Sequence, residues 1–576
     1  MRENHLPITE ESHPKTEDID KASKEEIVKL LKKCSSDIFT GWPGHQNVFD
    51  DKILAILKEV ATVAAQFLEP GTHKFGIILS GCGTSGRIAF LISRKFNELA
   101  KAEKLRSCYR YIISGGDHAI MTSVESCEDD WIAGKIALVN TAEGLDKVLY
   151  VGISCGLSAP FIGGQVEHCL QHPERFTPYL LGFNPARLAR NVAISGTDEV
   201  MLNIALKMEV KGYLLNPVVG PEPITGSSRM KGGTTTKMLL EAAFLHAHQL
   251  ATNDPTPIDF SEIFKIYETT LHLTHNKEAG ISSLVEMAGN SLIRGASVIY
   301  LGWDSLGIMG MVDAAECVPT FGANHDDVRS FLKGGFQLLR NVQGDLSSEG
   351  EKLKIGFEYF MEQRCAKVSM DDTVIFILPE LTSEQISELH LILNQVRRQT
   401  SNLAIIAINT NNNWQKEEYI TGSPLTIHIP LQDIKQSSII YNKFLEQCTT
   451  EVSLKWAINA VSTGAHILKG KVFKNSMIDL KLSNKKLFER GVRIVTQFST
   501  ISSEEATKCL LKSIYRQDFL DSRIVTADVA DHVKKAGDVE RVIPLAILLA
   551  KGFRVDLGLK MLHDCPIVRQ CLDNCL

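Results

Sequence analysis

The stretch from residue 74 to residue 89, KFGIILSGCGTSGRIA, constrains the fold of this chain more than any other. An apolar strand runs directly into a loop of glycines and hydroxyls, and a helix is predicted to open near Gly86. Glycines allow close backbone approach, and the hydroxyls of Thr84 and Ser85 are potential donors. Because the first N–H groups of a helix and its positive dipole end attract anions, the pattern predicts a phosphate-binding loop that includes Gly83. We call this loop the cradle.

The spacing GCGTSG also fits the GxGxxG pattern of dinucleotide-binding folds. However, no acidic residue closes a second strand about 20 residues later, as a ribose-binding residue would. No Gly-Lys-Ser/Thr follows, so the loop of nucleoside triphosphate enzymes is not matched either. A tight strand-to-helix turn would also explain the glycines alone, and the hydroxyl pair favours a ligand.

Strand and helix patterns alternate after the cradle, which indicates a parallel sheet covered by helices on both faces. The predicted strands are residues 75–80, 109–113, 148–154, 179–183 and 213–215. Ligands of such sheets bind at the carboxyl ends of the strands. Two further loops of glycines and hydroxyls follow strands there, with Ser154, Cys155, Gly156 and Ser158 in the first and Ser228 in the second. Each loop alone could be a helix cap, but three together predict one small phosphorylated ligand.

Acidic residues are concentrated before the next predicted helix, in SGGDHAIMTSVESCEDD. Helix capping is their ordinary role. Glu125 or Glu128 could instead accept hydrogen bonds from sugar hydroxyls or act as a general acid or base.

The sequence repeats itself after residues 251–259, ATNDPTPID, whose two prolines predict a domain boundary. Gly302 aligns with Gly81 and Gly307 with Gly86. The further predicted matches are residues 331–335 with 112–116 and residues 373–378 with 147–152. The second copy has lost the phosphate-binding residues, since Ser305 and Leu306 replace the hydroxyl pair and Leu378, Pro379 and Glu380 end the strand that led to the serine loop. We therefore expect one intact and one degenerate cradle.

Composition excludes several classes of protein. With 44% hydrophobic and 23% charged residues and a formal charge of −6, the chain has no basic excess for nucleic acid or an anionic membrane. Its 13 cysteines include no CxxC pair, so neither a disulfide framework nor a metal site is predicted, and no cofactor is expected. The polar amino end and the short apolar run at 542–550 predict an intracellular protein that spans no membrane.

Five motifs carry a family resemblance: GCGTSGR, GISCGLSAP, GPEPITGSSRMKGG, DAAECVPTFG, and the long stretch from KWAINAVSTG to LSNKKLFERGVRIV. They resemble the sugar isomerase (SIS) fold, in particular the N-acetylmuramic acid 6-phosphate etherase family, over nearly the whole chain. In an etherase, GTSGR leads directly into the Asp-Ala-x-Glu-Cys segment. This chain divides the two halves between two units, an arrangement that resembles the glucokinase regulatory protein family of animals.

The resemblance implies an α/β fold of two tandem SIS domains, each a parallel-sheet α/β sandwich, with an all-helical carboxyl-terminal cap. The expected boundaries are an arm and helix at 1–50, a first unit at 51–255, a second at 260–480 and the cap at 481–576. It also implies which residues bind the ligand. Glu128 and Glu316 would contact the sugar, with Glu316 crossing from the second unit, and the phosphate would contact Thr84, Ser85, Ser154, Gly156, Ser228 and Lys486, next to Asn484 in LSNKKL.

For function, the resemblance implies a non-catalytic regulator of the cytoplasm and nucleus that binds and inhibits glucokinase. Fructose 6-phosphate would favour inhibition and fructose 1-phosphate would oppose it. The implied partner surface includes Glu174, Arg175 and the loop at 430–440 with Leu431. An etherase-like lyase is the alternative, because the carboxylates of Glu125, Glu128 and Glu316 are present. An aldose–ketose isomerase is less favoured, because no cradle loop contains a histidine.

Overall fold

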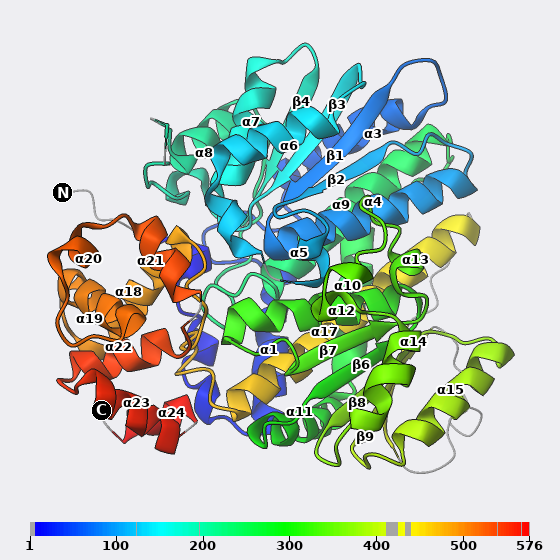
Figure 1. Ribbon diagram of the computed structural model, residues 1–576. Coiled ribbons are helices and arrows are strands. Elements are labelled where there is room, and N and C mark those ends of the chain that lie inside the picture. The colour runs from blue at the N-terminus through cyan, green and yellow to red at the C-terminus, as the bar shows by residue number, and fades with distance from the viewer. Residues whose placement is uncertain are drawn as a thin grey trace.

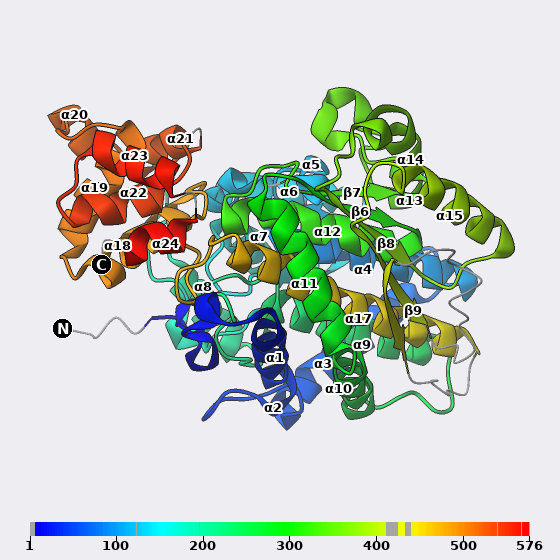
Figure 2. The same cartoon turned by 90° about the horizontal axis from the view of Figure 1, so that it is seen from below.

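The computed structural model describes residues 6–122, 124–194, 196–197, 199–409, 424–431, 439–537, 539–565 and 567–574. Two sheet-containing units lie against each other, and a group of carboxyl-terminal helices packs beside both (Figure 1). Seen from below, the amino-terminal arm lies along one side of the two units, below the carboxyl-terminal helices in this view (Figure 2). The predicted fold class is confirmed.

The first unit is a parallel sheet with the strand order β2-β1-β3-β4-β5. Its strands are β1 (Phe75–Gly81), β2 (Tyr109–Ile113), β3 (Lys147–Ile153), β4 (Phe176–Leu181) and β5 (Leu214–Leu215). Side chains alternate between the two faces, so that Ile77 packs in one core and Ile78 in the other. The first core is shared with α3 (Asp51–Leu68), α4 (Gly83–Ala102) and α9 (Lys231–Ala251), and the second with α6 (Trp131–Thr141), α7 (Pro160–Gln171) and α8 (Met201–Val210). The short elements are α5 (His118–Met121), η4 (Glu125–Asp129) and η5 (Ala186–Leu188).

The second unit is also a parallel sheet, with the order β10-β9-β8-β6-β7. Its strands are β6 (Val298–Gly302), β7 (Val328–Leu332), β8 (Thr373–Leu378), β9 (Leu403–Asn409) and β10 (Leu425–Pro430). One face packs on α10 (Phe260–His275), α11 (Glu278–Ile293), α12 (Asp304–Phe321) and α17 (Ile439–Leu468), and the other on α14 (Phe357–Tyr359) and α15 (Ser383–Val396). Short elements between β7 and β8 are α13 (Gly335–Leu339), η6 (Ser347–Glu349), η7 (Glu351–Leu353), the π-helical η8 (Phe360–Arg364) and η9 (Cys365–Lys367).

The two units repeat the same contact between the first strand and the helix that follows it. A Cβ atom added at Gly81 would lie 2.5 Å from the backbone nitrogen of Gly86, and one at Gly302 would lie 2.3 Å from Cα of Gly307. No real Cβ atom tolerates such distances, so glycine is required at the same place in both copies. The predicted duplication is therefore present in the fold.

One predicted alignment within the repeat is wrong by two residues. Thr373 pairs with Val298, whereas Leu149 pairs with Ile77, the residue that matches Val298 in the first unit. Residues 373–378 therefore correspond to 149–154 and not to 147–152. A shift of two residues leaves every side chain on the same face of a strand, so the hydrophobic pattern could not detect the error.

The amino-terminal arm contains η1 (Ile8–Glu10), η2 (Pro14–Thr16), η3 (Ile19–Lys21), α1 (Lys24–Ser35) and α2 (Asp37–Thr40). The hydroxyl of Ser23 caps α1 by accepting a hydrogen bond from the N–H of Glu26. The carboxylate of Asp37 receives hydrogen bonds from His13, Lys15 and Lys231, which tie the arm to the start of α9.

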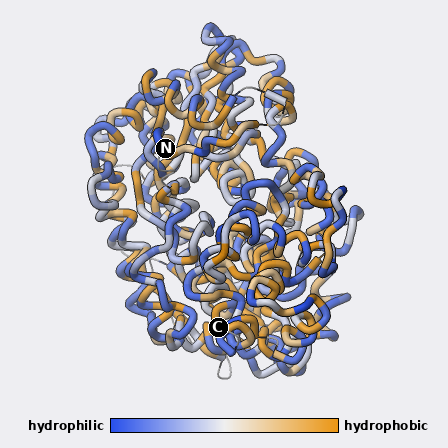
Figure 3. Tube along the Cα trace, turned by 90° about the vertical axis from the view of Figure 1, so that its left-hand side faces the viewer, coloured by the Kyte–Doolittle hydropathy of each residue, from blue (hydrophilic) through white to orange (hydrophobic). Residues whose placement is uncertain are grey.

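The carboxyl-terminal cap is formed by α18 (Lys485–Ser499), α19 (Ser503–Tyr515), α20 (Ser522–Thr526), α21 (Val529–Ala536), α22 (Val542–Ala550), α23 (Val555–Asp564) and α24 (Val568–Asp573). Ser502 and Glu505 form a capping box at the start of α19. The apolar α22 is buried within the cap. Hydrophobic and hydrophilic stretches alternate along the chain near its carboxyl end (Figure 3). Among the residues described, no helix has both the length and the apolar character to cross a membrane.

Candidate functional site

One pocket contains most of the predicted ligand-binding residues. It lies at the carboxyl ends of β1 and β3, and residues from the second unit and the cap complete its walls. The predicted residues that line it are Gly83, Thr84, Ser85, Glu128, Ser154, Cys155, Gly156, Ser158, Ser228, Glu316 and Lys486. Three parts of the chain that are distant in sequence therefore meet at one site.

The cradle is the first turn of α4, which begins at Gly83 rather than near Gly86. Thr84 and Ser85 therefore lie in the first helical turn, where the N–H of Ser85 donates to the carbonyl of Cys82 at 3.0 Å and the side-chain hydroxyls remain the nearest donors. The hydroxyl of Ser154 accepts hydrogen bonds from the N–H groups of Ser158 (3.0 Å) and Ala159 (3.2 Å), which shapes the second loop before α7. Such an assembly of backbone donors and hydroxyls suits a phosphate.

Cys155 lies beside the hydroxyl of Ser85, with 3.5 Å between the sulfur and oxygen atoms. Burial raises the pKa of the Cys155 thiol to about 11, so it is a neutral neighbour for an anion. The buried hydroxyl of Ser227 also lines the pocket and has no hydrogen-bond partner among the residues described. It is a donor that a ligand can use.

Glu316 of the second unit reaches the cradle of the first. One carboxylate oxygen accepts a hydrogen bond from the hydroxyl of Thr84 at 2.6 Å, and the other forms an ion pair with Arg87. Arg87 is fully buried, and its guanidinium also donates to the carbonyls of Ile120 and Thr122. The position of α12 thus depends on the same helix that forms the cradle.

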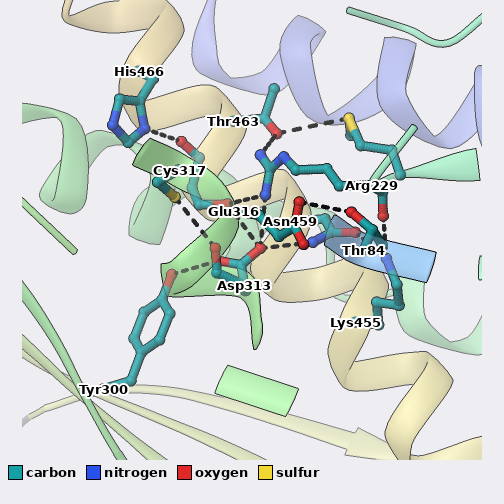
Figure 4. A network of polar contacts seen from close by, with 12 residues as sticks. Thr84, Arg229, Tyr300, Asp313, Glu316, Cys317, Lys455, Asn459, Thr463 and His466 are labelled. Carbon is teal, nitrogen blue, oxygen red and sulfur yellow. Dashed lines mark hydrogen bonds and ion pairs between the residues drawn. The ribbon is translucent and has the colours of Figure 1, made fainter. Parts of the chain in front are cut away.

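A polar network next to Glu316 joins the third loop to the second unit (Figure 4). The guanidinium of Arg229 donates to the carboxylate of Asp313 at 2.9 Å, and Asn459 donates to the same oxygen at 2.6 Å. The ammonium of Lys455 donates to the carbonyl of Arg229 at 2.5 Å. Burial, with the nearby charge of Arg229, lowers the pKa of Lys455 to about 8. Because Arg229 directly follows Ser228, the network holds that loop against α12 and α17.

Lys486 of the cap and Glu128 form an ion pair with 2.6 Å between ammonium and carboxylate. Asn484 does not line the pocket, but its amide donates to the other oxygen of Glu128 at 3.2 Å, and its carbonyl oxygen caps α18. The first turn of α18 is thereby fixed to η4. A phosphate bound in the cradle would therefore lie next to a cation and a carboxylate that are already held in place.

Arg490 was missed by the sequence reasoning and also lines the pocket. It lies one helical turn after Lys486, a spacing that could have identified it. Its guanidinium donates to both carboxylate oxygens of Glu10, at 3.0 and 2.5 Å, and Arg493 binds the same carboxylate. A Cβ atom at Gly226 would lie 2.6 Å from the guanidinium carbon of Arg490, so this glycine leaves room for the arginine.

Several predicted residues lie elsewhere. Glu125 belongs to η4, and its side chain is outside the described part of the structure. Glu174 is exposed on the surface, and Arg175 donates to the carbonyls of Leu145 and Ala142. Leu431 is buried with 4% of its surface exposed, and the following residues, 432–438, are outside the described residues. The predicted partner surface remains a prediction.

The corresponding loop of the second unit does not suit an anion. Asp304 takes the place of Gly83 and has the same left-handed backbone, with φ of 50° compared with 49°. Its carboxylate stands at the start of α12, where it repels an anion from the helix terminus. The preceding Trp303 is fully buried and packs edge-on against Phe357, with 4.8 Å between ring centroids. The described residues include no group of three or more metal-ligating side chains.

Three family models match successive parts of the chain. They describe the glucokinase regulatory protein N-terminal SIS domain (residues 59–170), the second SIS domain of that protein (275–469) and its C-terminal lid domain (474–572). Similarity to individual proteins agrees with this. The chain is 37% identical over 558 residues to the glucokinase regulatory protein of Xenopus laevis, covering 95% of this chain and 89% of the relative. Identity to the Homo sapiens protein is 35% over 564 residues, with coverage of 94% and 88%.

A bacterial relative is similar to a smaller part of this chain. The N-acetylmuramic acid 6-phosphate etherase of Clostridium beijerinckii is 28% identical over 236 residues, which is 41% of this chain and 71% of the etherase. The three domain models and the two long alignments together show that this chain belongs to the glucokinase regulatory protein family.

Proposed function

We propose that this chain binds fructose phosphates in the cradle and is a glucokinase inhibitor whose affinity for the enzyme depends on which one is bound. The observation that carries this proposal is the meeting of Thr84, Glu316 and Lys486 at one pocket. These residues belong to the first unit, the second unit and the cap. A bound ligand can therefore change how the three parts are placed, and an inhibitor surface formed by them would change with it.

The residues of the pocket suit a sugar phosphate. The start of α4 and the hydroxyls of Ser85 and Ser154 can bind phosphate oxygens, and Lys486 and Arg490 can offset the charge. The carboxylate of Glu128 can accept hydrogen bonds from sugar hydroxyls. Lys486 is paired with Glu128, so a phosphate would compete with that carboxylate for the ammonium.

Sugar identity can affect the response because the two fructose phosphates carry the phosphate on different carbons. With the phosphate held in the cradle, each sugar would present different hydroxyls to Glu128 and Glu316. Two ligands shift a conformational equilibrium differently only if they make different contacts in its states. We propose that fructose 6-phosphate favours the glucokinase-binding arrangement and fructose 1-phosphate opposes it.

An etherase-like lyase is the second candidate, since Glu128 and Glu316 both line the pocket. Their partners favour a binding role over proton transfer. Both oxygens of Glu316 are engaged by Thr84 and Arg87, and both oxygens of Glu128 are engaged by Lys486 and Asn484. Incubation with N-acetylmuramic acid 6-phosphate tests this candidate: released lactate would support the lyase, and its absence would support the regulator.

A pull-down of purified glucokinase tests the proposed binding. We expect retention of glucokinase on the immobilised chain, more with fructose 6-phosphate and less with fructose 1-phosphate. Glucose 1-phosphate, with a different ring, is a control for a nonspecific phosphate effect. Retention that neither fructose phosphate changes would contradict the proposed sensing, and no retention under any condition would contradict the proposed partner.

A further inference from the structure

A second cavity lies between the two units and shares no lining residue with the cradle. One wall is formed by α4 and the edge strand β2 of the first unit, and the other by residues 340–343, which follow α13 of the second unit. Its volume is about 700 Å³, compared with about 110 Å³ for the cradle pocket. Ligand pockets commonly measure roughly 300–1,000 Å³ and occur at domain interfaces.

A set of hydrogen bonds holds the two walls together. The carboxylate of Asp117 accepts hydrogen bonds from the hydroxyl of Tyr111 (2.8 Å), the amide of Asn341 (2.9 Å) and the N–H of Gln343 (2.7 Å). In return, the side-chain oxygen of Gln343 accepts a bond from the N–H of Asp117 at 3.0 Å. Because these groups belong to both units, the cavity has a defined shape before any ligand enters.

The charge of the lining is positive. Four cationic side chains line the cavity, namely Arg94, Lys101, Arg110 and Arg340, against the carboxylates of Glu98 and Asp117. Asp117 is already saturated by the hydrogen bonds between the walls. Glu98 is shared between Arg94 at 3.2 Å and Arg340 at 3.1 Å, and Nε of Arg94 is buried without a hydrogen-bond partner among the residues described. The lining of the cavity therefore carries an excess of two positive charges.

The remaining lining mixes polar side chains, such as Ser93, Asn97 and Asn140, with apolar and aromatic ones. Of its aromatic residues, Tyr111 is partly exposed, whereas Phe90 and Tyr109 are 0% and 4% exposed. Guanidinium groups bind phosphate oxygens with good geometry, and aromatic side chains pack against planar rings. We propose that this cavity binds a small organic dianion with a planar body, of the mononucleotide class, and that such a ligand bridges the two units. A hexose phosphate lacks the planar body, so the cavity is distinct from the cradle in the ligand it takes.

Calorimetric titration of the full chain with AMP tests the proposal. Adenosine, which lacks the charge, and inorganic phosphate, which lacks the ring, are the ligand controls. We expect one AMP per chain, with roughly 10- to 100-fold tighter binding than either control, because a charged hydrogen bond and the ring contribute together. Excess fructose 1-phosphate and the Lys486→Ala variant should leave AMP binding unchanged. Failure of fructose phosphate binding in the cradle would leave this result unaffected.

Arg94→Gln should weaken the affinity for AMP by roughly 10- to 100-fold. The matched control is Arg294→Gln, because Arg294 is an exposed arginine paired with Asp371. If Arg94→Gln does not fold, Arg340→Gln, whose side chain is 63% exposed, should still weaken binding by a smaller factor. The proposal is overturned if AMP does not bind, if fructose 1-phosphate displaces it, or if the arginine variants that fold bind AMP as the wild type does.

Discussion

At the scale of single residues, Glu316 links the cradle of the first unit to the second unit. Its carboxylate contacts Thr84 of the cradle and the fully buried Arg87. A buried ion pair is costly to break, because the remaining charge is left without compensation. The etherase resemblance was needed to predict this contact, since the spacing of residues around 316 says nothing about a partner 232 positions earlier.

We predict that Glu316→Gln weakens fructose phosphate binding by about 1–3 kcal/mol, because an amide replaces one acceptor oxygen by a donor. It should also lower the melting temperature, since Arg87 loses its counter-charge. Calorimetric affinity and a thermal melt measure both effects. Glu388→Gln, in an ion pair with Lys333 away from the pocket, is the control. Wild-type affinity in a folded Glu316→Gln protein would rule out a site shared between the units.

Lys486 provides the second residue prediction. Lys486→Ala should weaken a phosphate ligand by about 2–4 kcal/mol, because a charge-assisted partner of a desolvated anion is lost. The neighbouring Lys485 has its ammonium 3.6 Å from Asp528 and does not line the pocket, so Lys485→Ala should bind as the wild type does. Titration of both variants with fructose 1-phosphate makes the comparison. Equal affinities of the two variants for fructose 1-phosphate would show that Lys486 does not bind the ligand.

At the scale of elements, η1 and α18 are joined by a carboxylate that the sequence did not reveal. Glu10 of η1 is held by Arg490 and Arg493, one on each side. The arm has few apolar residues, so hydrophobic periodicity predicted only that it packs against something. Its partner is determined by tertiary folding, which brings together residues 480 positions apart.

The charge state of Glu10 gives a pH prediction. Burial alone would raise the pKa of this carboxyl, but the two arginines outweigh burial and lower its pKa below the ordinary value of 4.5. A lowered folded-state pKa contributes stability above 4.5 that is lost as the pH falls through the folded value. Glu10→Gln should therefore melt below the wild type at neutral pH, and the difference should shrink as the pH falls below 4.5. Glu11→Gln is the control. A difference that does not change with pH would contradict the assignment.

The elements that carry the cradle were largely predictable. The strand, glycine loop and helix of the cradle follow one another as β1 and α4, and the repeat of Gly81 and Gly86 at Gly302 and Gly307 identified the second unit. The register between the two copies of the repeat could not be predicted, because a two-residue shift of β8 leaves its apolar pattern unchanged. Strands β9 and β10 were not predicted individually, although each continues the second sheet.

At the scale of the whole molecule, buried charges fix one unit against the other. Lys95 of α4 donates to Glu241 of α9 at 2.9 Å and to Glu451 of α17 at 2.6 Å, and Lys237 completes the cluster at 2.8 Å from Glu451. Two ammonium and two carboxylate groups compensate one another, and all four side chains are buried. Such a cluster constrains the relative position of the units, because displacing one charged partner leaves the others buried without compensation.

A consequence of the degenerate second loop is that the chain should bind one fructose phosphate. Asp304 and the buried Trp303 occupy the region that corresponds to the cradle. Isothermal titration should therefore give one site per chain, and Ser85→Ala should weaken that site without exposing another. Two equivalent sites in the wild type would show that the second loop still binds ligand.

The central claim is that a sugar phosphate in the shared pocket controls the inhibition of glucokinase. Its most direct test is the initial rate of purified glucokinase with increasing amounts of this chain, alone and with each fructose phosphate. We expect the chain to lower the rate, fructose 6-phosphate to strengthen this inhibition and fructose 1-phosphate to relieve it. Glucokinase rates that the chain does not change under any of the three conditions would contradict the proposed regulation.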